Sequence, residues 1–207
     1  MRIHIIEDDD ALRTALARLL GACGYRVDVH ASAEAFLRAG TGGEAGCILL
    51  DVDMPGLGGL ELQDRLRASG SILPIVFLTG NGSIAMSVRA IKAGAEDFLS
   101  KPVGKEALLD AIGRAMRRYE TAAARDSLLS DLRGRAAMLT AREREVFALV
   151  VRGLLNKQIA FELGNTERTV KAHRRSLMEK LGAGSLAELV QMANRLGVSD
   201  PGHGAVQ

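Results

Sequence analysis

The 207-residue sequence is poor in aromatic residues and in cysteine. It has no Trp and only 3% aromatic residues, so its hydrophobic cores must be built from aliphatic side chains. Without an aromatic platform beside its basic residues, recognition of RNA or single strands by base stacking is disfavoured. Its two cysteines, Cys23 and Cys47, lack metal-like spacing, and we expect both to be small buried residues in a reducing compartment.

Long hydrophobic runs are also missing. No apolar segment approaches the roughly 18 residues that a membrane-spanning helix needs. We find no signal peptide, because Arg2 leads through "IHII" directly into a block of acids. These absences predict a soluble, cytoplasmic protein that does not contact a membrane, while an apolar content of 47% is enough for real cores.

Charge is distributed unevenly along the chain. Residues 1–120 contain 14 Lys and Arg against 16 Asp and Glu, whereas residues 121–207 contain 13 against 9. A slightly acidic first part and a basic second part suggest two domains with different partners.

The first 118 residues alternate between strand-like and helix-like patterns. Two of the strands, "CILL" and "PIVFL", are continuously apolar, which favours a parallel sheet covered by helices on both faces. We therefore predict an α/β fold in which a five-stranded parallel sheet forms a doubly wound (βα)5 domain. The expected strands are 2–6, 26–30, 47–50, 74–78 and 97–100, and the expected helices are 10–22, 32–39, 58–68, 83–93 and 105–118.

The rest of the chain has helical patterns only. Residues 114–138 are rich in Ala and charged residues and contain no Pro, which predicts an extended helix, either continuous or broken at Gly134. Between about 140 and 196 we expect an all-α helix-turn-helix domain of four helices. Two of these begin at the capping boxes "TARE" (140–143) and "SLAE" (185–188). The other two end at Gly164 and Gly182, the second after an N-cap at Thr166.

These patterns divide the chain into four segments. We expect a first domain at 1–118, a helical linker at 119–138, a helix-turn-helix domain at 139–197 and a disordered tail at 198–207. The linker either holds the two domains apart or lets them dock.

Acidic residues follow two of the expected strands, where ligands bind in doubly wound sheets. Glu7 and Asp8 come after the first strand and Asp51 after the third. Carboxylates that converge in this way repel one another unless a hard cation such as Mg²⁺ lies between them. Thr79 and Lys101 follow the fourth and fifth strands and suit an anion. The constellation fits a carboxylate, Asp51, that attacks phosphorus.

Each of these residues also has an ordinary structural interpretation. Asp51 would cap a turn or helix, "EDDD" would be a solvated acidic run, and "TG" and "KP" would be loop residues. Their joint placement at four strand ends favours the functional interpretation. A phosphatase of the haloacid dehalogenase type is a second alternative, since "DVD" resembles its nucleophile motif. That motif normally follows the first strand, however, and no cap domain is present here.

The segments "IIEDDDALR", "LLDVDMPGLGGLEL", "IVFLTG" and "AIKAGAEDFLSKP" together resemble the receiver domain of two-component response regulators, over essentially all of residues 1–120. The resemblance implies that Asp51 is the phosphoacceptor. It implies Mg²⁺ ligands at Glu7, Asp8, Asp51 and the backbone carbonyl of Asp53. It also implies that Thr79 and Lys101 contact the phosphoryl group, and that Phe98 is a switch residue together with Thr79; plain core packing of Phe98 stays open. Glu7 stands where the family more often has Asp.

Residues 166–181 predict one helix with two distinct faces. Val170, Leu177 and Leu181 fall on one line with Met178 beside them, which indicates the buried face. The opposite side carries Arg168, Lys171, Ala172 and Arg175. This side is either a solvated charged face or the recognition surface of a helix that enters the DNA major groove.

The stretch "LTAREREVFALVVRGLLNKQIAFELGNTERTVKAHRRSLMEKLG" resembles the LuxR-type DNA-binding domain, over roughly 138–196. The resemblance implies base contacts from Lys171, Ala172 and Arg175. Lys157, Thr169 and Arg174 then become phosphate contacts. The last helix, 185–196, mediates dimerisation on DNA in that family, and packing on its own domain is the alternative.

Together these resemblances identify the chain as a FixJ/NarL-type response regulator. We expect a transcription factor, most often an activator, that is not an enzyme beyond accepting and slowly losing its own phosphoryl group. The expected partners are a cognate sensor histidine kinase, double-stranded promoter half-sites, a second copy when phosphorylated and RNA polymerase. A regulator that binds DNA independently of phosphorylation, with a degenerate receiver, is the alternative.

Overall fold

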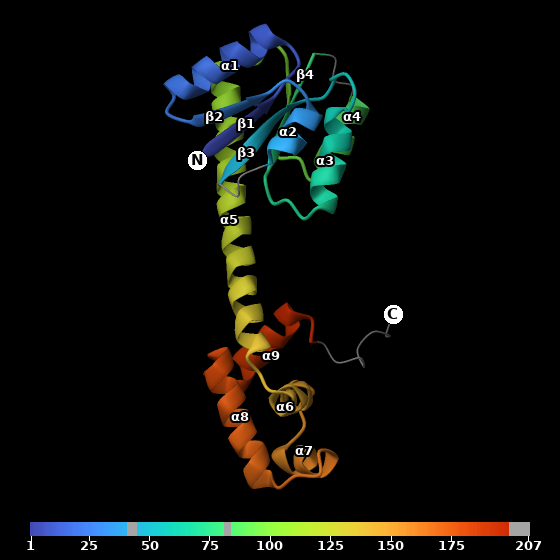
Figure 1. Cartoon of the computed structure of the whole chain (residues 1–207), viewed down its shortest axis with the longest axis vertical. Coiled ribbons are helices and arrows are strands. Elements are labelled where there is room, and N and C mark those ends of the chain that lie inside the picture. Colours follow the sequence, from blue (N-terminus) through green and yellow to red (C-terminus); the bar gives the residue numbers. More distant parts are fainter. Residues whose placement is uncertain (41–44, 81–83, 199–207) are drawn as a thin grey trace. The chain divides into compact units, whose positions relative to one another are not determined.

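A computed structural model describes residues 1–40, 45–80 and 84–198. The chain divides into two compact units, Met1–Ala124 and Arg125–Gln207 (Figure 1). The expected tail lies outside the described residues except for Val198, which packs against the core of the second unit. Over the described ranges, no helix is both long enough and apolar enough to span a bilayer.

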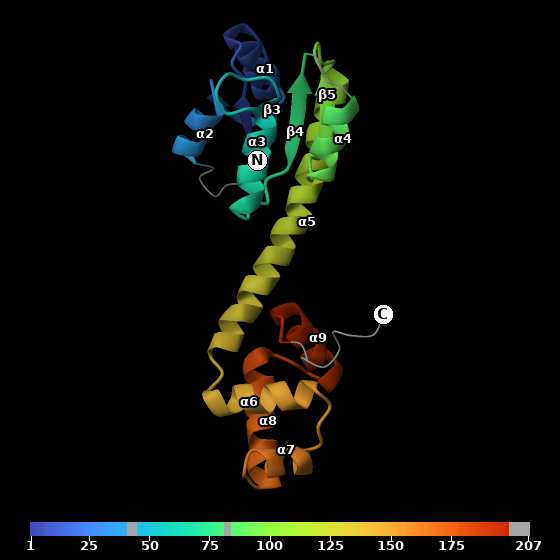
Figure 2. The same cartoon turned by 90° about the vertical axis from the view of Figure 1, so that its right-hand side faces the viewer.

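The first unit is a five-stranded parallel sheet with the strand order β2-β1-β3-β4-β5, which confirms the predicted doubly wound fold. Figure 2 shows helices on both sides of this sheet. The strands are β1 (Arg2–Ile6), β2 (Arg26–His30), β3 (Gly46–Asp51), β4 (Ile75–Thr79) and β5 (Asp97–Ser100). The helices that begin in this unit are α1 (Asp10–Ala22), α2 (Ala33–Ala39), α3 (Gly59–Ala68), α4 (Ile84–Lys92) and α5 (Lys105–Ala137).

Successive side chains of each strand face opposite sides of the sheet and fill two separate cores. Ile48 and Leu50 of β3 belong to a cluster with residues of α2, α3 and α4. Cys47 and Leu49 belong to a second cluster with residues of α1 and α5. All residues of β3 are buried, and full burial of an aliphatic side chain contributes about 1.5–3 kcal/mol. The continuous apolar pattern that predicted this strand therefore also accounts for its stability.

Three details differ from the sequence-based expectations, and one alternative that the sequence left open is decided. β3 includes Asp51 and β4 includes Thr79, so both side chains lie on the last strand residue rather than after it. Cys23 is exposed beyond the last turn of α1, whereas Cys47 is buried, and burial raises the pKa of the Cys47 thiol to about 12. α5 runs through Gly134 to Ala137 as one helix, because a glycine costs a helix only about 1 kcal/mol relative to Ala.

Gly46 opens β3 at a place where no side chain fits. It pairs with Arg2 of β1, and a Cβ on Gly46 would lie 2.1 Å from the Arg2 carbonyl oxygen. The close approach of β1 and β3 therefore requires glycine at this position.

The second unit contains the end of α5 and four further helices. These are α6 (Ala141–Val151), α7 (Asn156–Glu162), α8 (Glu167–Leu181) and α9 (Leu186–Leu196). The capping box of Thr140 and Glu143 is present as predicted. The second predicted box is only half present. Ser185 accepts the Glu188 N–H at 3.2 Å, but the Glu188 carboxylate accepts the N–H of Gly184, at 2.8 Å, so it closes the cap one residue earlier.

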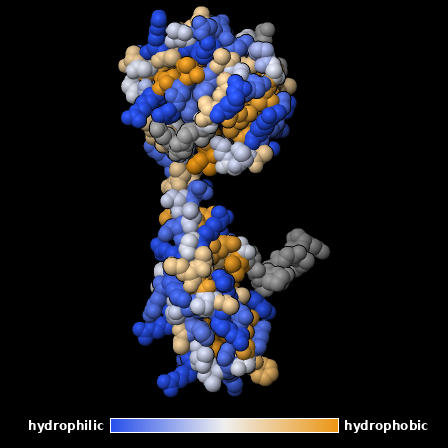
Figure 3. Space-filling view, viewed as in Figure 1, coloured by the Kyte–Doolittle hydropathy of each residue, from blue (hydrophilic) through white to orange (hydrophobic). Residues whose placement is uncertain are grey.

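α8 has the two faces that the sequence predicted. It begins after the N-cap Thr166 and ends at Gly182, whose φ of 73° is left-handed. Val170, Leu177 and Leu181 are fully buried in the core of the unit, with Met178 partly buried against it. Hydrophilic residues interrupt the apolar ones over the visible surface of each unit, as is usual for a water-facing surface (Figure 3).

Candidate functional site

The strand order brings the predicted acidic residues together. β1 and β3 are neighbours, and their register pairs Ile6 with Leu50. The next residues along these strands, Glu7 and Asp51, therefore lie side by side at the carboxyl edge of the sheet. At the same edge the Lys101 N–H donates to the Thr79 carbonyl oxygen at 2.7 Å, which joins the ends of β4 and β5. In doubly wound sheets this edge is where ligands bind.

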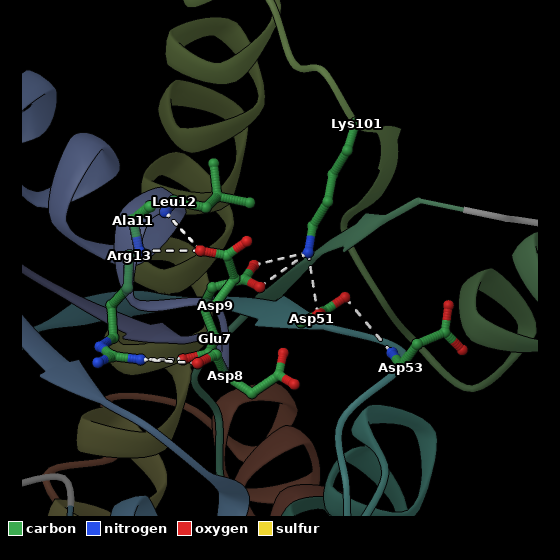
Figure 4. A network of polar contacts seen from close by, with 9 residues as sticks. All are labelled: Glu7, Asp8, Asp9, Ala11, Leu12, Arg13, Asp51, Asp53 and Lys101. Atoms are coloured by element: carbon green, nitrogen blue, oxygen red, sulfur yellow. Dashed lines mark hydrogen bonds and ion pairs between the residues drawn. The ribbon is translucent and has the colours of Figure 1, made fainter.

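The Lys101 ammonium lies between two carboxylates (Figure 4). Its Nζ is 2.9 Å from Asp51 Oδ2 and 2.7 Å from Glu7 Oε2. Both acids are almost completely buried, with 3% exposure for Asp51 and 1% for Glu7, so these ion pairs are poorly screened by water. Burial alone would lower the pKa of Lys101, but its hydrogen bonds to Glu7 and Asp51 raise that pKa above its ordinary value.

Carboxylate oxygens of Glu7, Asp8 and Asp51 lie within 4.8 Å of one another. Burial raises the pKa of Glu7 above its ordinary value, and the nearby Asp51 charge acts in the same direction, although Lys101 opposes both. Three carboxylates facing one ammonium leave an excess of negative charge in a buried place. The set therefore fits a hard divalent cation such as Mg²⁺, which prefers oxygen ligands and keeps several waters; the exposed Asp8 leaves room for those waters.

Asp53 takes part through its backbone. Its N–H donates to Asp51 Oδ1 at 3.4 Å, whereas its side chain is exposed and points away from Asp51 (Figure 4). The structure therefore places the Asp53 main chain beside the site and its charge in solvent.

Two residues that the sequence analysis missed hold the loop after β1. Arg13 of α1 donates to the carbonyl oxygens of Glu7, at 2.7 Å, and Asp8, at 3.2 Å, and also pairs with Asp10. Asp9 caps α1 by accepting the N–H groups of the next turn. An Asp directly before a helical pattern can be recognised in the sequence as an N-cap. The bonds from Arg13 to main-chain carbonyls cannot be recognised, because no side-chain pattern marks their acceptors.

The two expected switch residues occupy different surroundings. The Thr79 side chain is buried at the end of β4. Phe98 of β5 is partly buried against the α2–α4 core, and its ring centroid is 5.9 Å from that of Phe77. Phe98 is therefore a packed but incompletely covered ring.

The second predicted site lies on the exposed side of α8. Lys171, Ala172 and Arg175 are exposed, as is Lys157 near the start of α7. Four residues of the two helices, Asn156, Lys171, Arg174 and Arg175, line part of an open hollow of about 590 Å³. Lys171, Arg174 and Arg175 give this surface positive charge, although Glu179 also lines the hollow. The exposed Ala172 is a small apolar side chain of the kind that can contact a thymine methyl group.

Three of the predicted DNA contacts already have partners within the unit. The Arg174 Nη1 donates to Asn156 Oδ1 at 2.8 Å, which links α8 to the start of α7. The Arg175 Nε donates to Glu179 Oε1 at 2.9 Å, and the Thr169 hydroxyl lies 2.9 Å from the Thr166 hydroxyl. Arg174 and Arg175 keep further N–H donors, because a guanidinium has five.

A buried carboxylate fixes α8 to α6. Glu143, only 4% exposed, lies 2.6 Å from the Lys180 Nζ, accepts from the Ser176 hydroxyl at 2.7 Å and closes the capping box with the Thr140 N–H at 2.7 Å. These bonds lower the pKa of Glu143 to about 2, the Lys180 bond most of all. The exposed side of α8 is therefore presented by a tightly connected helix pair.

Comparison with known proteins assigns both units. The family described as response regulator receiver domain matches residues 3–113, and the family described as bacterial regulatory proteins, luxR family, matches residues 137–193. The transcriptional regulatory protein FixJ of Azorhizobium caulinodans is 43% identical over 197 residues, which cover 95% of this chain and 93% of FixJ. The chain is a two-component response regulator of the FixJ/NarL family.

Solved structures of response regulators agree with this assignment. The structure of response regulator StyR matches with a TM-score of 0.78 and 43% identity, over 94% of this chain and 98% of StyR. Full-length FixJ from B. japonicum matches with a TM-score of 0.58 and 41% identity, over 96% and 98%.

As a response regulator, the chain combines a receiver domain with a LuxR-type DNA-binding domain, and members of this family are DNA-binding regulators rather than classical enzymes. The acidic cluster and Lys101 fall within the receiver match, and α7 and α8 fall within the luxR match.

Proposed function

We propose that phosphorylation of Asp51 controls this regulator. The observation that carries the proposal is the buried Asp51 carboxylate, held 2.9 Å from the Lys101 ammonium and beside two further carboxylates. A carboxylate so placed is suited to attack phosphorus. One Asp51 oxygen forms the new bond to phosphorus while the phosphorus–nitrogen bond of a phosphohistidine on a sensor histidine kinase breaks, and the released imidazole takes up a proton.

Glu7, Asp8, Asp51 and the Asp53 carbonyl would hold Mg²⁺ at this edge. Bound there, the ion would neutralise charge that develops on the phosphoryl oxygens. Lys101, already 2.9 Å from Asp51, pairs with the transferred group, and the Thr79 hydroxyl donates to one of its oxygens. The reaction ends with one phosphoryl group per chain, which hydrolyses slowly instead of turning over.

The signal passes from the receiver to the DNA-binding domain. We assign residues 1–118 to the phosphoacceptor domain, 119–138 to a helical linker and 139–197 to the DNA-binding domain. The phosphoryl charge draws Thr79 toward it, and the partly covered Phe98 ring turns into the vacated space. The surface of α4, β5 and α5 then favours a homodimer and frees the second domain, with a coupling of about 1–3 kcal/mol.

The second domain reads double-stranded DNA through α8. Lys171, Ala172 and Arg175 face base edges in the major groove, and Lys157, Thr169 and Arg174 contact phosphates. The exposed positions of Lys171 and Ala172 support this orientation. The dimer binds paired half-sites and activates transcription, with RNA polymerase as the partner.

Beryllofluoride, which mimics a phosphoryl group, provides the test. Wild type and Asp51→Asn are compared by size-exclusion light scattering and by shift of a pool of promoter DNA fragments, with and without Mg²⁺ and the mimic. We expect dimerisation and tighter DNA binding in wild type only. No response in wild type, or an equal response in Asp51→Asn, would refute control by phosphorylation and leave a constitutive DNA binder.

A further inference from the structure

Glu34 of α2 is bonded to the loop that leaves the phosphoacceptor strand. Its Oε1 accepts the N–H of Leu57 at 2.9 Å, across 23 residues of sequence. Leu57 lies in the segment between β3 and α3, which begins directly after Asp51. A charged side chain from a neighbouring helix thus holds main chain of the loop that contains Asp53.

The Glu34 carboxylate belongs to the first turn of α2. Its own backbone N–H, the Leu57 N–H and Ser32, the N-cap of α2, lower the pKa of Glu34 below its ordinary value. The Leu57 hydrogen bond therefore ties the loop to the start of a helix.

The loop passes close to the Glu34 carboxylate at Gly56. Gly56 has a left-handed φ of 78°, and a Cβ added there would lie 2.9 Å from Glu34 Oε1. Leu57 and Met54 are buried in the same core cluster as Phe36 of α2. Apolar packing and the hydrogen bond between Leu57 and Glu34 therefore hold the same part of the loop, residues 54–57.

The other end of the loop is anchored to the sheet. The Val52 N–H donates to the Leu78 carbonyl oxygen at 3.0 Å, and the Asp53 N–H reaches Asp51 Oδ1 at 3.4 Å. Asp53 lies between these anchors and the Leu57 bond. Its carbonyl direction depends on both.

We propose that Glu34 is a positioning residue for the phosphoryl-transfer site, which fixes residues 53–57 and thereby sets the affinity of the site for Mg²⁺. This inference rests on the proposed function, in which the Asp53 carbonyl is one of the ligands. Removing a residue that hydrogen-bonds to a metal ligand typically weakens metal binding by about 10–100-fold. Because Glu34 acts on the Asp53 carbonyl through a loop, we expect an effect at the lower end of that range.

Two variants distinguish the effect of the Leu57 hydrogen bond on Mg²⁺ affinity from the effect of the Glu34 charge. Glu34→Ala removes the acceptor for the Leu57 N–H, and we expect the Mg²⁺ dissociation constant to rise about tenfold. Glu34→Gln keeps an acceptor oxygen at the same reach but removes the charge, and we expect affinity near that of wild type. Isothermal titration calorimetry of the full-length chain with MgCl₂ measures both without any phosphodonor.

Two controls complete the design. Ile112→Val trims a buried side chain of α5 in the other core and leaves α2 and the loop intact, so its Mg²⁺ affinity must stay near wild type while its urea midpoint falls. Asp8→Asn removes a proposed ligand and must weaken Mg²⁺ binding. Wild-type affinity in Asp8→Asn would refute the proposed function itself.

The remaining outcomes decide the role of Glu34. Wild-type Mg²⁺ affinity in Glu34→Ala, with weakened binding in Asp8→Asn, would overturn the inference and leave the proposed function standing. Equal losses in Glu34→Ala and Glu34→Gln would show a charge effect and would also overturn positioning by the hydrogen bond. A loss of Mg²⁺ affinity in Ile112→Val equal to that in Glu34→Ala would show that Glu34 acts only through stability.

Discussion

Replacing Glu143 by Gln tests how strongly α6 holds α8. The variant keeps the shape of the side chain but places an amide beside the Lys180 ammonium, 2.6 Å from the present carboxylate oxygen. The pKa of Glu143 is lowered from an ordinary 4.5 to about 2, chiefly by the Lys180 bond. At 1.36 kcal/mol per pKa unit this corresponds to about 3 kcal/mol. Because the Lys180 side chain is 33% exposed, water screens the pair, and we expect a loss of about 1–3 kcal/mol.

The pH dependence has a defined sign. A carboxyl group whose pKa is lowered by folding stabilises the folded state fully above its ordinary pKa of 4.5. That stabilisation is lost as the pH falls from 4.5 toward the folded value of about 2. Since Gln does not titrate, the stability difference between wild type and Glu143→Gln must shrink over this window.

Urea unfolding of the full-length chain, followed by methyl NMR signals of Val146 and Val170, provides the measurement. Both side chains are fully buried in the second unit and report its unfolding directly. Glu145→Gln is the matched control, because Glu145 forms an ion pair with the half-exposed Arg142 and such pairs contribute about 0–1 kcal/mol. A difference that stays constant between neutral pH and about pH 3, or one no larger than the control, would refute the assigned role of the ion pair.

Two further predictions concern DNA binding and the sheet. Lys171→Ala should weaken binding to operator DNA by about 1–3 kcal/mol in gel-shift titrations at fixed salt, and unchanged affinity would contradict the proposed orientation of α8. Gly46→Ala should lower the free energy of unfolding by about 1–3 kcal/mol or more, because its Cβ meets the Arg2 carbonyl oxygen at 2.1 Å. Gly21→Ala, which meets no atom within 4 Å, is the control and should not destabilise; equal urea midpoints for the two variants would show that the β1–β3 spacing adapts.

Local signals in the sequence predicted most of the elements. The Thr140 and Glu143 capping box is complete within four residues, so no tertiary information was needed to place the start of α6. That Glu7, Asp51 and Lys101 share one edge was also predictable, because parallel strands have a common carboxyl edge. That Glu7 and Asp51 lie side by side depends on the strand order, which places β1 beside β3. Strand β3 could be predicted without knowing that its side chains alternate between two cores, because a run that is apolar throughout suits a strand with a core on each face.

Contacts to distant main chain were not predictable. Arg13 binds the carbonyls of Glu7 and Asp8, and Glu34 binds the N–H of Leu57. Because every residue offers such backbone groups, no side-chain pattern marks the partner. The prediction that Cys23 is buried was wrong. Its apolar character suggested burial, but Cys23 follows the last residue of α1, beyond the buried Leu16 and Leu20, and is exposed.

The ion pair between Lys101 and Glu7 joins residues 94 positions apart. During synthesis, Glu7 and Asp51 leave the ribosome well before the lysine that lies between them in the folded protein. A nascent chain, or a fragment that stops before β5, therefore carries the acids without their ammonium counter-charge. Pairing over such a separation also makes folding slower than local helix formation. The acidic cluster therefore gains its counter-charge only when β5, an edge strand, has been made and has joined the sheet.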